Sequence, residues 1–384
     1  MTRRFNRSNA AMVLLPTLGL LMASCSEPTP SSPATLSEAA LAAISPDSGA
    51  PRDQLARQID DLFSMQGLGE TRAVLLIVDG KVAAERYGPD YDSETRFVSW
   101  SMAKTVTAVL VGMLAADGLL NIDQPAPVPS WQRSGDARAD ITLKHLLQMR
   151  SGLRHTEAGN PPYESSEVRM LFLDGRDDMA KWAKEQPLEA EPGARFEYSS
   201  NTTVILADIA ARALTASTDP YDRRKAVADY LEERLFAPLG MTSIVPEFDA
   251  SGTLIGGSLM HANARDWGRF GEFLRTRGQA PGGEQLVPRR WIDAMVTPSP
   301  AASLYGYQIW LNRPAADLER SHPLFPDRAP ASLYSLIGHM GQYVLISPEQ
   351  GVTMVRLGHS DSEERPKMLQ EAADVLALYP VDGT

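Results

Sequence analysis

The chain has 384 residues, of which 43% are hydrophobic and 22% charged, a composition typical of one or two globular domains. The formal net charge is -11, and no run of Lys and Arg interrupts the acidic background, so we expect no nucleic-acid partner. The single cysteine, Cys25, excludes an intramolecular disulfide, a thiolate zinc cluster and a Cys-x-x-Cys redox pair.

Residues 1–24 have the layout of an export signal. A basic start precedes the apolar stretch Ala10–Leu21, and small residues lead up to Cys25. The stretch is too short to favour a membrane-spanning helix, and a cysteine at the cut site resembles a bacterial lipobox. At such a site the thiol is lipidated and becomes the mature N-terminus, which attaches the protein to a membrane. A plain signal peptide with an incidental cysteine is the alternative.

Residues 25–50 are predicted to form a flexible tether. From Ser26 to about Ser48 the chain is rich in Pro, Ser, Thr, Glu and Ala, and it has too few large apolar residues to bury a core. We therefore expect a periplasmic lipoprotein of the bacterial cell envelope. Ser26 is not the acidic residue that retains some lipoproteins at the inner membrane, which favours an outer-membrane anchor.

Extended segments are predicted near both ends of the chain. The apolar run Ala73–Val78, the turn residues Asp79-Gly80 and the segment Lys81–Arg86 together indicate a β-hairpin. A second pair of strands is predicted on either side of a turn at residues 347–350. Its strands are Gln342–Ile346 and Gly351–Leu357.

Helices are predicted between these strands. Apolar residues recur at helical spacing from Ser101 to Asp117, and Gly118 follows as a C-terminal cap, so this helix is expected to be largely buried. Further helices are predicted at Leu143–Met149, Thr202–Leu214, Arg223–Leu235, Ala264–Arg277 and Pro366–Leu378.

This order of elements predicts an α/β (α+β) fold. Strands at both ends form one antiparallel sheet flanked by helices, and an all-α region is inserted between them. We expect one domain over residues 51–384. Its α/β part covers about 51–115 and 255–384, and its helical part covers about 116–254.

Ser101 and Lys104 are three residues apart at the start of a predicted helix, which places a hydroxyl and an amine on one face. A lysine takes the proton of a serine only if burial and nearby positive potential lower its pKa toward neutrality. Ser-x-x-Lys alone is a weak signal, because a helix start with a capping serine and an exposed lysine explains it equally well.

Four blocks of sequence strengthen this signal. Phe97–Thr105, followed by an apolar helix, resembles the nucleophile helix of the serine β-lactamase and penicillin-recognising superfamily. Ile141–Leu153 is similar to the helix and turn that follow it, Phe196–Asn201 to the second catalytic motif, and Gly338–Gln342 to the third. The blocks occur in the same order as in that superfamily.

The resemblance covers roughly Leu55–Leu378 and indicates the branch that contains class C β-lactamases, related esterases and 6-aminohexanoate-oligomer hydrolases. Gly256–Phe270 and Tyr305–Trp310 are similar to the esterase and aminohexanoate-hydrolase members. The resemblance implies a β-lactamase/transpeptidase-like fold.

The resemblance also implies roles for three residues. Ser101 attacks a carbonyl, Lys104 accepts or relays the serine proton, and Tyr198 acts as base or as proton shuttle to the leaving group. Which of Lys104 and Tyr198 takes the first proton is left open. The chemistry requires no cofactor.

Two positions depart from the family pattern. Ser200 stands where class C β-lactamases carry an asparagine, which argues against efficient penicillin turnover. His339 replaces the lysine of Lys-Thr-Gly, which weakens carboxylate recognition, whereas Gly341 keeps the glycine. The backbone N–H groups of Gln342 and Ser101 are expected to form the oxyanion hole.

We therefore expect a serine hydrolase that cleaves small esters or linear amides through an acyl-enzyme on Ser101. A β-lactamase or a D-Ala-D-Ala peptidase is one alternative. A non-catalytic envelope lipoprotein that binds cell-wall fragments or β-lactams is an alternative of another class. The six histidines show no His-x-x-x-His spacing, so no metal site is predicted.

Overall fold

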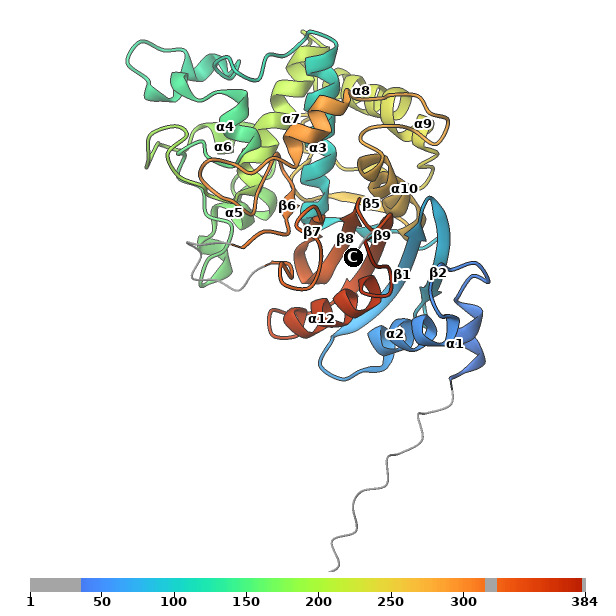
Figure 1. Ribbon diagram of the computed structural model, residues 1–384. Coiled ribbons are helices and arrows are strands. Elements are labelled where there is room, and N and C mark those ends of the chain that lie inside the picture. Colours follow the sequence, from blue (N-terminus) through green and yellow to red (C-terminus); the bar gives the residue numbers. More distant parts are fainter. Residues whose placement is uncertain (1–35, 315–322, 382–384) are drawn as a thin grey trace, which may run out of the picture. The chain divides into compact units, whose positions relative to one another are not determined.

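The computed structural model describes residues 36–314 and 323–381 (Figure 1). The predicted export signal, Cys25 and the first part of the predicted tether lie outside the described residues. The described residues contain a six-stranded antiparallel sheet with the strand order β2-β1-β9-β8-β7-β6. Its strands are β1 Glu70–Val78, β2 Lys81–Tyr87, β6 Trp310–Leu311, β7 Tyr334–Gly338, β8 Gln342–Ser347 and β9 Val352–His359.

Strand β1 is apolar on both faces because both faces are covered. Ala73, Leu75 and Ile77 belong to the core shared with the helical region, whereas Val74 and Leu76 belong to a second core. Successive side chains of a strand point to opposite faces, so a continuous apolar run is what a strand between two layers requires. Pairing with β9 joins this early strand to the end of the chain.

The predicted hairpin is confirmed. Val78 pairs with Lys81, and the two residues between them have φ of 47° (Asp79) and 78° (Gly80). Positive φ at both central residues matches the right-handed twist of the flanking strands, and Asp-Gly is a favoured pair for it.

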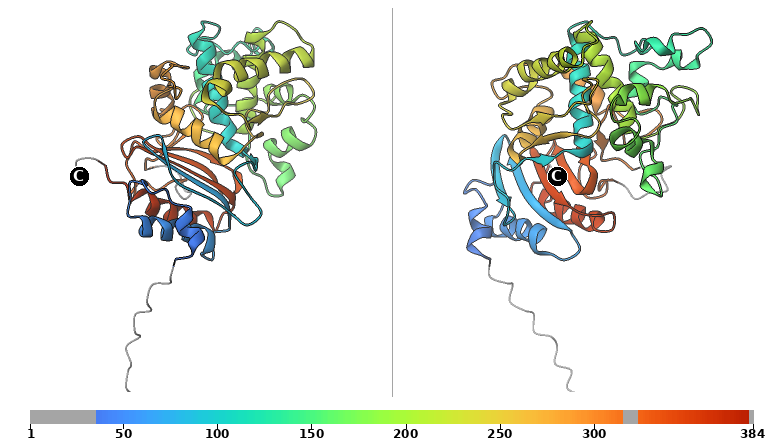
Figure 2. Two further views of the ribbon diagram at one scale, coloured as in Figure 1. Left: turned by 90° about the vertical axis from the view of Figure 1, so that its right-hand side faces the viewer. Right: turned by 180° about the vertical axis from the view of Figure 1, so that it is seen from behind.

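Helices cover the two faces of the sheet. Figure 1 shows α2 (Arg52–Ser64) and α12 (Arg365–Leu376) on one side together with the short helix α1 (Glu38–Ala42), and α10 (Ala264–Arg275) with α3 to α9 on the other. Apolar residues of α2 and α12 pack against one face in one core, and those of α10 pack against the other face. The turned views in Figure 2 show the same layers.

The helical region surrounds α3 (Ala103–Ala116), whose residues from Ala103 to Leu114 are all buried. The cap Gly118 has φ of 76°, as predicted. The other helices on this side are α4 Leu143–Leu147, α5 Ser166–Phe172, α6 Met179–Lys184, α7 Ser200–Leu214, α8 Pro220–Leu231, a π-helical turn Glu232–Phe236, α9 Ala237–Leu239 and α11 Arg289–Met295. A small sheet orders β3 (Phe97–Val98), β5 (Met260–Ala262) and β4 (Val245–Pro246). These elements confirm an α+β fold.

The second part of the predicted tether is folded, which corrects the expectation of a flexible segment up to residue 50. Residues Glu38–Ala42 form α1, capped by the side chain of Ser37. Ala40 is fully buried, and Ile44 pairs with Ala84 at the edge of the sheet. Small residues in this segment fit against the sheet, although composition alone indicated a disordered chain.

The length and hydropathy of the described helices can be set against those of membrane-spanning helices. Within 36–314 and 323–381, no helix combines the length and the hydropathy that crossing a bilayer requires.

The burial of β1 between two layers leads to a stability prediction. Leu75→Ala removes a side chain that is 1% exposed in the core, and we expect it to lower the free energy of unfolding by about 2–5 kcal/mol. The matched control is Leu119→Ala, since Leu119 is 50% exposed and its truncation should cost less than about 0.5 kcal/mol. Urea unfolding measures both. Equal losses in the two variants would contradict the two-layer packing.

Candidate active site

Ser101 lies in a short 3-10 turn, Trp100–Met102, between β3 and α3. The expected helix therefore begins two residues later, at Ala103. The preceding residue, Ser99, is fully buried, and its N–H donates to the carbonyl of Met260 over 2.7 Å. Trp100 has φ of 45°, a conformation that costs energy in a bulky residue and occurs where the surrounding structure requires it. The backbone on the N-terminal side of Ser101 is thus fixed by the small sheet.

Strand β7 approaches the Ser101 turn very closely, and this approach depends on glycine. A Cβ atom on Gly338 would lie 2.3 Å from the carbonyl oxygen of Ser99. No larger residue fits there without moving one backbone away from the other. Gly338 therefore sets the distance between the third sequence block and Ser101.

Lys104 points back toward Ser101 from the first turn of α3 and is 1% exposed. Its Nζ donates hydrogen bonds to Ser101 Oγ (2.8 Å), to Ser200 Oγ (2.7 Å) and to the carbonyl of Gly257 (2.8 Å). An ammonium has three N–H donors, and all three have an acceptor here.

The pKa of Lys104 is shifted in the opposite direction from the one that the sequence interpretation required. Burial lowers the pKa, but Tyr198, Glu157 and Glu167 raise it, and the net direction is upward. The expected positive potential is absent, because carboxylates surround the amine instead. Lys104 is therefore an ammonium at neutral pH.

Tyr198 contacts both Ser101 and Lys104. Its ring centroid lies 4.8 Å from Lys104 Nζ, and Trp310 packs against the ring at 5.1 Å. Burial raises the pKa of the phenol, while the charge of Lys104 and hydrogen bonding to Ser101 and Lys104 act to lower it. The structure thus brings Tyr198 to a serine and a lysine that lie almost a hundred residues earlier in the sequence.

Two glutamates that sequence reasoning missed lie close to Lys104, and both also line the cavity into which Ser101 opens. Glu157 Oε1 is 3.6 Å from Lys104 Nζ, and the Oγ of Ser200 lies 2.7 Å from Glu157 and 2.8 Å from Glu167. Both glutamates lie in the segment between two recognised blocks, and no motif or spacing marks them. Only the fold brings them to the lysine.

Ser200, with His339, Gly341 and Gln342, was predicted to contact the substrate or the oxyanion, and in the structure Ser200 lies next to Lys104. Its side chain is fully buried at the start of α7, where it contacts Lys104 and the two glutamates. It does not line the cavity into which Ser101 opens.

Ser101 opens into a cavity of about 690 Å³. Tyr198, His339, Glu157 and Arg365 supply polar groups to its wall. The apolar part of the wall is formed by Val168, Leu171, Phe172, Trp310, Ile337 and Leu369, among others.

His339 faces this cavity in a neutral state. Burial and the nearby charge of Arg365 lower the pKa of the imidazole, and Glu157 offsets only part of the shift. The ring contacts Trp100 edge to face, with 5.4 Å between the centroids. At neutral pH the third block therefore does not supply the permanent cation of Lys-Thr-Gly.

Gly341 and Gln342 form the turn into β8 and do not line the cavity with side chains. Gly341 has φ of 84°, and a Cβ there would lie 2.7 Å from Nη1 of Arg356. The side-chain amide of Gln342 donates to the carbonyl of Gly358 over 2.6 Å, so it is used to join β8 to β9. Any role of Gln342 toward a substrate is left to its backbone N–H.

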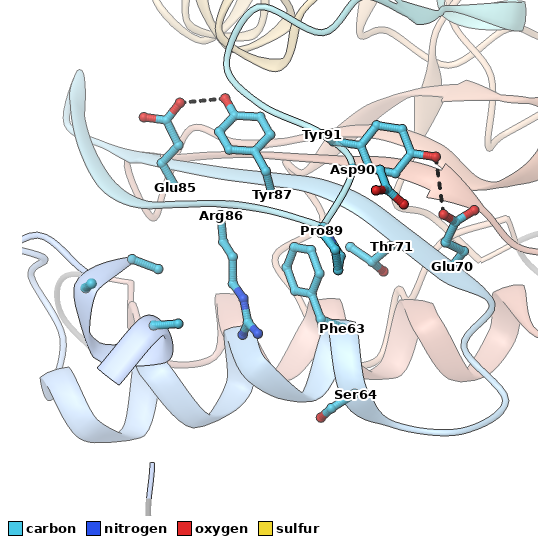
Figure 3. A pocket seen from close by; sticks show the side chains of 14 residues that line it. Phe63, Ser64, Glu70, Thr71, Glu85, Arg86, Tyr87, Pro89, Asp90 and Tyr91 are labelled. Atoms are coloured by element: carbon cyan, nitrogen blue, oxygen red, sulfur yellow. Dashed lines mark hydrogen bonds between the residues drawn. The ribbon is translucent and has the colours of Figure 1, made fainter. Parts of the chain in front are cut away.

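A second cavity, of about 710 Å³, lies beside β1 and β2 but is not lined by Ser101, Lys104 or Tyr198 (Figure 3). Two of its carboxylates accept hydrogen bonds: Tyr87 donates to Glu85 over 2.6 Å, and Tyr91 donates to Glu70 over 3.3 Å. Ser64 and Asp90 line it as well, without the buried lysine and the phenol that accompany Ser101.

Within 36–314 and 323–381, no three or more His, Cys, Asp and Glu side chains lie together in a way that could hold a metal ion.

Comparison with known proteins identifies the family. The family model described as Beta-lactamase matches residues 65–378, so the chain belongs to the Beta-lactamase family. No curated protein sequence matches the chain significantly.

Solved structures share the fold. One, from Bacillus anthracis and assigned as a 6-aminohexanoate-dimer hydrolase, is 21% identical with a TM-score of 0.63, over 81% of this chain and 80% of that chain. A family VIII carboxylesterase is 17% identical with a TM-score of 0.61, over 85% and 96%. A penicillin-binding protein homologue from Caulobacter crescentus is 17% identical with a TM-score of 0.60, over 86% and 98%. The solved structures that share this fold thus include proteins described as a 6-aminohexanoate-dimer hydrolase, an esterase and a penicillin-binding protein homologue.

The close approach at Gly338 can be tested directly. We expect Gly338→Ala to displace the turn that carries Ser101 and to slow reaction of Ser101 with a fluorophosphonate by at least about tenfold. The matched control is Gly282→Ala, because a Cβ on Gly282 meets nothing within 4 Å. Labelling rates are followed by mass spectrometry. A parent-like rate in Gly338→Ala would show that the approach does not position Ser101.

Proposed function

We propose that this protein is a serine hydrolase that cleaves small esters or linear amides through an acyl-enzyme on Ser101. The observation that carries the proposal is the position of the Ser101 hydroxyl. It is hydrogen-bonded to the buried ammonium of Lys104 at 2.8 Å, it interacts with the phenol of Tyr198, and it opens into a cavity of about 690 Å³.

In this mechanism the Lys104–Tyr198 pair first gives one proton to the carboxylate of Glu157, which lies 3.6 Å from Lys104 Nζ, because an ammonium and a phenol have no free site for another proton. Ser101 Oγ then bonds to the substrate carbonyl carbon as its own proton passes to the pair. The backbone N–H groups of Ser101 and Gln342 stabilise the oxyanion. Tyr198 then returns a proton to the leaving alcohol or amine. Water releases the acyl group in a second step that uses the same residues, and no cofactor takes part.

The substrate preference is supported by what the cavity offers. Its wall is largely apolar, as a small ester or a linear amide requires. Ser200 is turned away from the cavity and offers no amide to a β-lactam side chain. His339 is neutral at neutral pH and holds a substrate carboxylate less strongly than a lysine does. Both departures from the family pattern support a preference for small esters and linear amides over β-lactams and D-Ala-D-Ala peptides.

The test of the nucleophile uses mass spectrometry after incubation with a fluorophosphonate. We expect one covalent adduct, located on Ser101, and none on Ser101→Ala. Hydrolysis of a p-nitrophenyl ester should fall in Ser101→Ala to below about one thousandth of the parent rate. A parent protein that forms no adduct would contradict the proposal and favour a non-catalytic lipoprotein that binds cell-wall fragments or β-lactams.

The test of the substrate order compares kcat/KM for a p-nitrophenyl ester with kcat/KM for nitrocefin. We expect the ester to be the better substrate by at least about tenfold, because the site lacks the groups that hold a β-lactam. A reversed order would make β-lactam hydrolysis the function.

The proposed site of action is the bacterial cell envelope. We propose that the thiol of Cys25 is lipidated and anchors the protein, with an outer-membrane location favoured by Ser26; the support is the sequence around these residues. Cells fed an alkyne fatty acid should label the parent protein and not Cys25→Ala. Labelling of both proteins, or of neither, would contradict the anchor.

A further inference from the structure

The side of Lys104 that faces away from Ser101 contains an unusual group of hydrogen-bonding partners. Ser200 Oγ lies 2.7 Å from Lys104 Nζ, 2.7 Å from Glu157 Oε1 and 2.8 Å from Glu167 Oε1. The charge of Glu157 is one of the causes that raise the pKa of Glu167. A hydroxyl has one proton and two lone pairs, so these contacts restrict where the protons can be.

Counting the donors around Ser200 Oγ indicates that one of the two glutamates is protonated. Lys104 donates to one lone pair of Ser200 Oγ, and the hydroxyl proton of Ser200 goes to one carboxylate. The remaining carboxyl group can bond to the same oxygen only as a donor, so it must be protonated. Two carboxyl groups within 2.8 Å of one hydroxyl oxygen also disfavour a negative charge on both.

The surroundings indicate which glutamate holds it. Glu157 accepts the backbone N–H of Ser200 over 2.6 Å and lies 3.6 Å from the ammonium, and both contacts favour the anion. Burial, and then the charge of Glu157, raise the pKa of Glu167 to about 7. Glu157 is thus the anion of the pair and Glu167 the acid, close to the pH at which Glu167 ionises.

We propose that Glu157 and Glu167 form a proton-holding pair that exchanges protons with Lys104 through Ser200 during the reaction of Ser101. This inference rests on the proposed function of Ser101. It answers a question that the site leaves open, because a Lys104 ammonium with three donated hydrogen bonds has no lone pair with which to accept the Ser101 proton. The glutamates act through Lys104 and are positioning residues.

The exchange can be written so that every proton is accounted for. Lys104 gives one proton to Ser200 Oγ, the Ser200 proton passes to Glu157 Oε1, and Lys104 takes the proton of Ser101 as Oγ bonds to the carbonyl carbon. The negative charge moves from Glu157 to the substrate oxyanion. When the intermediate collapses, the proton returns by the same path to Lys104 and Tyr198 and leaves on the departing alcohol.

Other titratable groups face the same centre and shape its response to pH. Lys104 lies on α3, Glu167 on α5 and His339 at the turn after β7. The half-buried Tyr198 and the buried Tyr305 lie nearby. Burial keeps both phenols protonated by raising their pKa, and it keeps His339 neutral by lowering its pKa. Of these groups, Glu167 is the one that ionises near pH 7.

The first test is the pH dependence of kcat/KM for a p-nitrophenyl ester. Ionisation of Glu167 adds a second negative charge to the pair and makes it a better proton acceptor, so the parent rate should rise about three- to tenfold as pH increases through about 7. Glu167→Gln should lose this rise. The matched control is Glu164→Gln, an exposed carboxylate of the same segment, which should keep the parent profile. A Glu167→Gln profile that still rises through about pH 7 would overturn the inference.

The second test removes the link and leaves both carboxyl groups in place. Ser200→Ala should lower kcat by about 10- to 100-fold with little change in KM, because the pathway is cut behind the lysine and away from the cavity. Urea unfolding checks that the variant is folded. A folded Ser200→Ala with the kcat of the parent would overturn the inference.

The third test does not depend on activity. Infrared titration of the parent should show one protonated carboxyl band that disappears as pH increases through about 7, and Glu167→Gln should lack it. If the band is present but Ser101 forms no adduct and cleaves no ester, the proposed function fails while the shared proton stands. If esters are cleaved but the band is absent, the proton-holding pair fails and the hydrolase stands.

Discussion

The ammonium of Lys104 is almost completely removed from water, and a charge in such a place is stable only if the protein replaces its hydration. Ser101, Ser200 and Gly257 supply three acceptors, and Glu157 supplies a compensating charge at 3.6 Å. These partners come from the turn before α3, the start of α7 and two segments between helices. The helical region must therefore be correctly folded before the lysine can be buried, and the same contacts hold the Ser101 hydroxyl in place.

Glycine makes this convergence possible at two points. A Cβ on Gly338 would lie 2.3 Å from the carbonyl of Ser99, and a Cβ on Gly257 would lie 2.8 Å from the carbonyl of Ser200. Glycine at position 338 lets strand β7 come close to the turn that carries Ser101. Glycine at position 257 lets this backbone pass close to the start of α7, where the Gly257 carbonyl accepts a hydrogen bond from Lys104. Glycine at these points costs conformational entropy on folding, which the surrounding packing must offset. The geometry of the site is thus determined largely by backbones in direct contact.

The sequence predicted the elements whose signal is local. The hairpin after β1 follows from an apolar run and Asp79-Gly80, and the buried helix α3 follows from its apolar spacing and Gly118. Three of the site residues were recognised from family motifs. The folded α1 was not predicted because its small residues gain their burial from a distant strand. Glu157 and Glu167 were not predicted because no spacing marks them, and without them the pKa of Lys104 was expected to shift downward.

The central claim is that a buried cation holds a reactive serine beside an oxyanion site. A crystal structure of the protein after reaction with a fluorophosphonate tests it most directly. We expect phosphorus bonded to Ser101 Oγ, its oxygen within about 3 Å of the backbone nitrogens of Ser101 and Gln342, and Lys104 still in contact with Ser101 and Ser200. An unmodified Ser101, or an adduct whose oxygen points away from both nitrogens with Lys104 turned toward solvent, would contradict the account.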